Sequence, residues 1–67
     1  MFVIDGGKVR GIRESKFLTQ HNLAVKTDLH DTYISKIENS KLNGSYDLVK
    51  KLAEALGVTP EDITSEI

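Results

Sequence analysis

Apolar residues recur every three or four positions in four segments of the chain, residues 6–16, 19–26, 31–39 and 46–56. This spacing is typical of helices that bury one face and expose the other. The positions that we expect to form one shared core are Val9, Ile12, Leu18, Leu23, Ala24, Leu29, Ile34, Ile37, Leu48, Leu52, Ala53 and Leu56. Only residues 2–4 could extend, which would give two strands at most. The pattern therefore predicts an all-α fold.

Capping residues stand where these helices should begin and end. Asp5, Thr19 and Ser45 each carry a side-chain oxygen that can cap a helix beginning at the next residue. Gly57 follows the last apolar position of the fourth helix and suits its C-terminal cap. The sequence TPED at residues 59–62 places a proline at the first position of a further short helix. We therefore expect a compact domain of five helices.

Two short helices around a turn occupy the middle of the chain. Leu23 and Ala24 precede a turn centred on Asp28, and further apolar residues follow it in the next helix. The small side chain of Ala24 allows the second helix to cross closely over the first. We predict a helix-turn-helix over about residues 19–39, followed by a loop at NSKLNGS, residues 39–45.

The length of 67 residues allows one small domain. We expect it to span residues 1–67, with a short N-terminal extension over residues 1–5. The chain has no cysteine, and His21 and His30 are too far apart to form a helical ligand pair, so we expect no metal and no cofactor. The N-terminus is too poor in apolar residues for a secretory or membrane-spanning segment. A soluble cytoplasmic protein is expected.

The formal net charge of −1 hides an uneven distribution. Residues 1–51 hold all nine Lys and Arg against six Asp and Glu, and therefore carry a net charge of +3. Residues 52–67 hold four acids and no base. A weakly basic face toward nucleic acid is compatible with this pattern, since attraction depends on local charge. An ordinary solvated surface shows the same mixture, so charge alone does not decide.

Three ordered segments carry a family resemblance: IRESKFLTQHNLA at residues 12–24, YISKIENSK at 33–41 and LVKKLAEALGVTPEDI at 48–63. Together they resemble the XRE, or Cro/C1-type, helix-turn-helix family of phage and bacterial transcriptional regulators, over about residues 7–64. The segment DTYISKIE, residues 31–38, also resembles the small controller proteins of restriction-modification systems. The resemblance implies a lambda-repressor-like domain whose third helix enters the major groove of double-stranded DNA.

The chain departs from the family pattern at several positions. Asp28 and Phe17 each replace a frequent glycine, and aspartate is among the few other residues that tolerate left-handed backbone. Thr27 stands where an apolar residue is usual. His30 occupies the cap position of the third helix, where serine or threonine is customary, and it is a weak cap.

The third helix presents one side away from the core. If Ile34 and Ile37 point inward, Thr32, Ser35, Lys36 and Asn39 face outward, with Asp31 on the flank. The candidates for contacts to DNA bases are Asp31, Thr32, Ser35 and Lys36. Lys36 could read guanine or approach a phosphate. Asp31 could accept a hydrogen bond from cytosine, or could simply stabilise the positive end of the helix dipole.

Other polar residues around these helices are candidates for contacts to the phosphate backbone: Thr19, Gln20, Tyr33, Asn39, Lys41 and Asn43. Tyr33 could instead fill space beside the core. The resemblance implies that Arg13 on the first helix pairs with Glu38 on the third as a mostly buried ion pair. An exposed, weak pair is the alternative.

The function expected from these features is that of a sequence-specific DNA-binding regulator, with repression as the default. It should act as a homodimer on an inverted repeat, with Val58, Ile63 and Ile67 near the C-terminus as the interface. The alternative is a protein-protein interaction module, such as an antitoxin, that docks a partner through apolar surface. We expect no enzyme, because His30 between two acids in sequence is not a catalytic relay.

Overall fold

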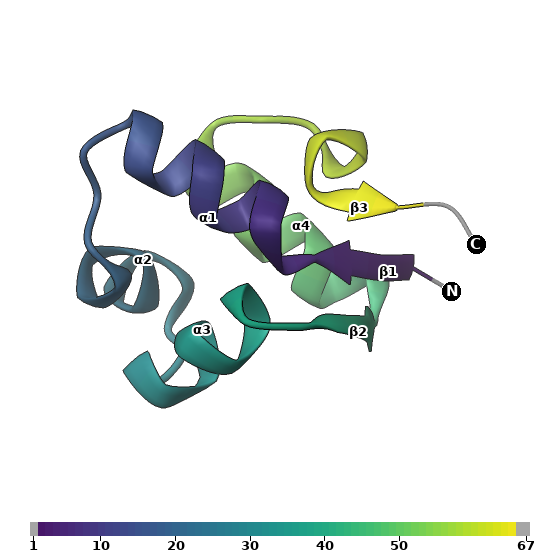
Figure 1. Ribbon diagram of the computed structural model, residues 1–67, viewed down its shortest axis with the longest axis horizontal. Helices are drawn as coiled ribbons and strands as arrows, with labels where there is room; N and C mark the ends of the chain where they lie inside the picture. Colours follow the sequence, from purple (N-terminus) through teal and green to yellow (C-terminus); the bar gives the residue numbers. More distant parts are fainter. Residues whose placement is uncertain (1, 66–67) are drawn as a thin grey trace.

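The computed structural model describes residues 2–65. In chain order the elements are β1 (Phe2–Asp5), α1 (Gly6–Ser15), α2 (Gln20–Thr27), α3 (Asp31–Glu38), β2 (Lys41–Gly44), α4 (Tyr46–Leu56), a 3₁₀ helix (Pro60–Ile63) and β3 (Thr64–Ser65). Figure 1 shows α2 and α3 at one end of the domain and the three strands at the other. The four predicted α-helices are present, each within one or two residues of its expected bounds.

The prediction of an all-α, five-helix fold is wrong in two respects. Residues 2–65 contain four α-helices, and the expected fifth helix is a single 3₁₀ turn. They also contain a three-stranded antiparallel sheet in the order β2-β1-β3. Composition predicts a loop at Lys41–Gly44, but Ile4 of β1 lies opposite Leu42 of β2 and Thr64 of β3. Pairing with a distant strand satisfies the backbone of these short segments, which local composition does not encode.

The helix caps form as the sequence predicts. Asp5 accepts hydrogen bonds from the backbone N–H groups of Gly7 and Lys8, at 3.1 and 3.3 Å. Ser45 accepts from Leu48 N–H at 3.2 Å, and Gly57 ends α4 in left-handed backbone with φ of 71°. These caps satisfy amide groups that the helices themselves leave unpaired.

Eleven apolar side chains form the core: Ile4, Val9, Leu23, Ala24, Ile34, Ile37, Val49, Leu52, Ala53, Leu56 and Ile63. Ile4, Val49 and Ile63 were not expected there, whereas Ile12, Leu18, Leu29 and Leu48, which were, are only half-buried. Core membership shifts in this way because the sheet and the 3₁₀ turn each bring an isoleucine inward.

The predicted dimer contact through Ile63 is contradicted, because Ile63 is fully buried within its own chain. The 3₁₀ turn packs against α4 and α1, and this packing directs the side chain into the core. Val58 is half-buried against the same core. Ile67, the third residue of the expected interface, lies outside the described residues.

The start of α1 lies directly against the end of α3, and this contact helps to place α3. Gly6 N–H donates to the carbonyl oxygen of Ser40 at 3.1 Å. A Cβ on Gly6 would lie 2.5 Å from that oxygen and closer still to the carbonyl of Ile37. Glycine is therefore required here by close backbone approach.

None of the helices in residues 2–65 has the length and the apolar character that crossing a membrane would need.

Candidate nucleic-acid interface

A left-handed residue makes the turn between α2 and α3. Asp28 has φ of 58° and ψ of 35°, and Leu29 N–H donates to Ala24 carbonyl oxygen at 3.0 Å. Asp28 thus adopts the backbone for which the family commonly uses glycine. Thr27 is buried, and its hydroxyl donates to the carbonyl oxygen of Leu23 at 2.8 Å. A polar residue is tolerated in this apolar place because its hydroxyl has a partner.

The rotation of α3 about its axis agrees with the inward direction expected from its two isoleucines. Ile34 and Ile37 are fully buried. Thr32 and Lys36 are exposed on the other side, and Ser35 is half-buried between the two. Because side chains about 100° apart around a helix face different directions, burial of the isoleucines turns Thr32 and Lys36 toward solvent and leaves Ser35 at the edge of the exposed side.

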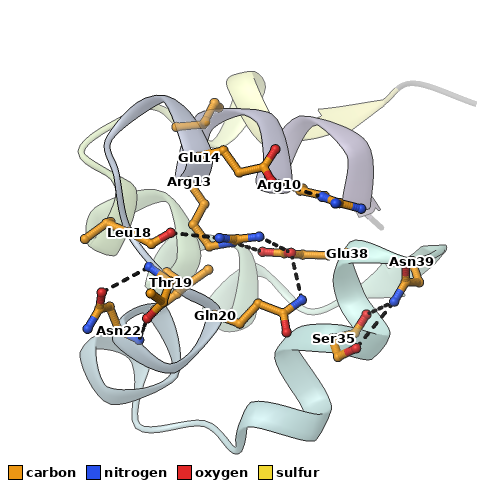
Figure 2. Close-up of polar contacts among 12 residues, drawn as sticks. Arg10, Arg13, Glu14, Leu18, Thr19, Gln20, Asn22, Ser35, Glu38 and Asn39 are labelled. Atoms are coloured by element: carbon orange, nitrogen blue, oxygen red, sulfur yellow. Dashed lines mark hydrogen bonds and ion pairs between the residues drawn. The ribbon is translucent and has the colours of Figure 1, made fainter.

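The end of α3 is held by side chains from its own last turn. Asn39 Nδ2 donates to Ser35 carbonyl oxygen at 2.8 Å and to Ser35 Oγ at 3.4 Å, as Figure 2 shows. Ser40 Oγ donates to Lys36 carbonyl oxygen at 2.7 Å. These bonds satisfy carbonyl groups at the helix end and fix Ser35 and Asn39 relative to each other.

An ion pair ties α3 to α1. Arg13 Nε and Nη2 donate to the two carboxylate oxygens of Glu38 at 2.6 and 3.0 Å (Figure 2). Arg13 Nη1 donates to Leu18 carbonyl oxygen at 2.7 Å, so the guanidinium also holds the turn after α1. The exposed fractions of the two side chains are 9% and 1%. The hydrogen bond to Glu38 raises the pKa of Arg13 above its ordinary value.

The same carboxylate receives a contact from α2. Gln20 Nε2 donates to Glu38 Oε1 at 3.1 Å, so this amide nitrogen, expected at a phosphate, lies against an acid of the protein instead. Thr19, also expected at a phosphate, caps α2: its hydroxyl accepts from Asn22 N–H at 3.0 Å, and Asn22 Oδ1 accepts from Thr19 N–H at 3.0 Å. Both residues stand at the start of α2 (Figure 2).

The remaining candidates for phosphate contacts lie on α3 and β2. Tyr33 is half-buried and packs against the core, which agrees with the alternative that it fills space beside the core. Lys41 and Asn43 are exposed and alternate along β2 with the half-buried Leu42 and Gly44. Because successive side chains of a strand point to opposite faces, Lys41 and Asn43 share the outer face of β2.

The acid at the start of α3 has a partner that the sequence did not indicate. His21 Nδ1 lies 3.0 Å from Asp31 Oδ2 and 3.2 Å from Oδ1. His30 makes no capping hydrogen bond to α3, as expected of a weak cap. His21 and Asp31 are ten positions apart on different helices, and the crossing of α2 and α3 brings them together.

Residues 2–65 hold no group of three or more His, Asp or Glu side chains placed to bind a metal ion.

Comparison with known proteins identifies the family. A helix-turn-helix family model matches residues 9–63 of the chain. The control protein C.BamHI of Bacillus amyloliquefaciens is 51% identical over 59 residues, which are 87% of this chain and 73% of that protein. The chain belongs to the XRE, or Cro/C1-type, helix-turn-helix family of DNA-binding transcriptional regulators.

Two further members of the XRE family show how widely the likeness extends. The immunity repressor protein of Bacillus phage phi105 is 34% identical over 61 residues, 91% of this chain and 42% of that protein. The crystal structure of the restriction-modification controller protein C.AhdI from Aeromonas hydrophila superposes with a TM-score of 0.78 at 33% identity, over 85% of this chain and 86% of that chain. The XRE-family resemblance seen in the sequence is thus confirmed.

Proposed function

We propose that this regulator binds an inverted-repeat DNA site as a homodimer, with α3 of each copy in the major groove of one half-site. The observation that carries this proposal is the orientation of α3. Burial of Ile34 and Ile37 leaves the opposite side of the helix exposed, with Thr32 and Lys36 on it. A helix with one exposed polar side fits the major groove, which is about 12 Å wide.

Within this arrangement, the side chains that read base edges are Asp31, Thr32, Ser35 and Lys36. Lys36 donates to guanine O6 and N7, and the hydroxyl groups of Thr32 and Ser35 donate or accept as the base requires. The side chains that contact phosphate are Thr19, Gln20, Tyr33, Asn39, Lys41 and Asn43. Gln20 exchanges part of its contact with Glu38 for a phosphate in this scheme, whereas Lys41 and Asn43 are already exposed.

Arg13 and Glu38 take no part in binding DNA. Their mutual contact and their burial assign them to holding α3 against α1. An acid in α3 therefore need not repel the phosphate backbone, because the charge of Glu38 is neutralised inside the protein.

We further propose that the genes regulated by this protein are those of a restriction-modification system. Two similar proteins, C.BamHI and C.AhdI, are named as a control protein and as a restriction-modification controller protein. The likeness covers most of this chain and of both relatives. Repression by covering a promoter is the default outcome of such binding.

The alternative of a protein-docking module predicts an apolar patch formed by residues 2–4 with Val58, Ile63 and Ile67, of which Ile67 lies outside the described residues. Ile4 and Ile63 are fully buried, so these two residues do not contribute to such a patch. The alternative remains distinguishable by salt. Binding through phosphates weakens steeply as salt concentration rises, whereas an apolar contact between proteins changes little.

The experiment that tests the proposal compares two charge reversals. Lys36→Glu places an acid on the outward side of α3, and Lys51→Glu makes the same change on an exposed position of α4. Binding to duplexes selected from a random pool is measured by fluorescence anisotropy at two salt concentrations, and folding by thermal melting. We expect Lys36→Glu to abolish specific binding with unchanged melting, and Lys51→Glu to retain the site preference. An unchanged site preference in Lys36→Glu would refute the assignment.

A further inference from the structure

The contact between His21 and Asp31 lies on the exposed surface of the helix-turn-helix. An ionised carboxylate has no proton to donate, so the hydrogen of this contact is carried by His21 Nδ1. Nδ1 lies within hydrogen-bond distance of both carboxylate oxygens, at 3.0 and 3.2 Å. The imidazole therefore fixes the direction of the carboxylate as well as its position.

The contact between His21 and Asp31 contributes too little to stability to be explained as a support of the fold. The side chains of His21 and Asp31 are 71% and 59% exposed. Exposed pairs of this kind contribute about 0–1 kcal/mol to stability. The buried contact of Glu38 with Arg13 already joins α3 to the rest of the domain.

Two neighbouring residues of α2 engage acids at the two ends of α3. Gln20 contacts Glu38 in the last turn, and His21 contacts Asp31 at the first position. Asp31 and Glu38 are seven residues apart, which is about 10 Å along a helix. This flank of α3 is thus held at two points by α2, and the first point is solvent-exposed beside Thr32.

A carboxylate at this place needs to be oriented if it is to read a base. An unrestrained Asp31 would sample several rotamers, including ones that turn its charge toward a phosphate. With Nδ1–H shared between its oxygens, the carboxylate keeps further lone pairs for another donor. In the major groove, the donor that a carboxylate selects is the N4 amine of cytosine.

We propose that His21 is a positioning residue for base recognition, which holds Asp31 in the orientation that accepts a hydrogen bond from cytosine N4 at the base pair facing the start of α3. This inference rests on the proposed function, because it requires α3 to lie in the major groove. It assigns Asp31 to cytosine rather than to the helix dipole alone.

The test uses selection from random duplex DNA with wild type, His21→Ala, His21→Asn, His21→Gln, Asp31→Asn and the double variant His21→Ala with Asp31→Asn. We expect wild type to prefer cytosine at one position of each half-site, and His21→Ala and Asp31→Asn each to weaken that preference about tenfold. All other positions should keep their preferences. The double variant should lose no more than Asp31→Asn alone, because His21 acts through Asp31.

The two amide variants separate positioning from mere loss of the ring. The side-chain nitrogen of asparagine occupies about the place of Nδ1, so His21→Asn should restore the cytosine preference. Glutamine places its nitrogen about where Nε2 lies, so His21→Gln should not. Thermal melting of each variant checks that the exposed substitution leaves the fold intact.

Distinct results would overturn this inference and the function beneath it. If wild type selects no preferred sequence, the proposed function fails. If wild type selects an operator but His21→Ala keeps the full cytosine preference, or the losses of the two single variants add in the double variant, His21 does not position Asp31.

Discussion

At the scale of single residues, the pair of Arg13 and Glu38 has the largest energetic consequence. Both charges are almost fully removed from water, and each satisfies the other in a bidentate contact. Such a pair stabilises little over a well-packed apolar pair, but removal of one partner leaves a buried charge uncompensated. The large loss of stability is therefore expected when only one of the two residues is substituted.

Arg13→Ala should lower the free energy of unfolding by about 3–5 kcal/mol, because the buried Glu38 would keep the amide of Gln20 but lose its cationic partner. Urea denaturation followed by circular dichroism measures the change. Arg10→Ala is the matched control on the same helix. Its contact with Glu14 is exposed, so its loss should cost at most about 1 kcal/mol. Equal effects of the two substitutions would contradict the buried-pair account.

Phe17 combines two unfavourable features in the turn after α1. Its φ is 58°, and the residue is 94% exposed. A side chain in left-handed backbone costs about 1–2 kcal/mol, and an exposed ring recovers little of this by packing. The family commonly has glycine at this place, in agreement with that backbone.

Phe17→Gly should raise the free energy of unfolding by about 0.5–1 kcal/mol, since relief of the strained backbone exceeds the entropy that glycine gains in the unfolded chain. Thermal melting measures the shift. Phe17→Ala removes the ring but keeps the Cβ, and should leave stability within about 0.5 kcal/mol of wild type. A loss of stability in Phe17→Gly would show that the ring makes a stabilising contact.

Residue roles could be predicted from the sequence where one helix face decides them. Ile34 and Ile37 fix the outward side of α3 by spacing alone, and the burial confirms their direction. The contacts of Gln20 and His21 could not be predicted in this way. They depend on how α2 crosses α3, and no periodicity within either helix encodes that crossing.

At the scale of elements, the helices were predictable and the sheet was not. Each helix has its own apolar spacing, and α1, α2 and α4 also have a capping residue, namely Asp5, Thr19 and Ser45, so the signal is local. The strands are two to four residues long, and β1 pairs with segments near residues 41–44 and 64–65. Strands of this length are too short for a detectable alternation of apolar and polar residues, and their pairing partners lie far away in the sequence.

The junction of α1 with α3 gives a test at this scale. Gly6→Ala should lower the free energy of unfolding by about 3 kcal/mol or more, because its Cβ would collide with the backbone oxygens of Ile37 and Ser40. Gly11→Ala is the control on the same helix. Its Cβ would meet no atom within 4 Å, so the better helix former should stabilise by up to about 1 kcal/mol.

Urea denaturation of both alanine variants measures these opposite shifts. A tolerated Gly6→Ala would contradict the close approach of α1 to the end of α3, and with it the placement of α3.

At the scale of the whole molecule, the proposed complex places one copy on one half-site. The described domain measures 29 × 20 × 19 Å. Half-sites of helix-turn-helix dimers lie about 34–36 Å apart, which is one turn of DNA. One copy carries a single α3 and spans less than this distance, so the proposed inverted repeat needs a second copy.

Insertion of about five base pairs between the half-sites should sharply reduce affinity, because it places the second half-site on the opposite side of the duplex. Insertion of about ten should restore part of the affinity. Anisotropy titrations of the two duplexes against the unaltered operator measure this. Equal affinity for all three duplexes would indicate that each copy binds alone.

The most direct test of the account is a comparison of base preferences between wild type and Lys36→Ala. If the outward side of α3 reads base edges, selection from random duplexes should show that one base pair in each half-site loses its preference while the others keep theirs. A uniform loss of affinity with every preference retained would place Lys36 at a phosphate. Unchanged affinity and unchanged preferences would contradict the position of α3 in the groove.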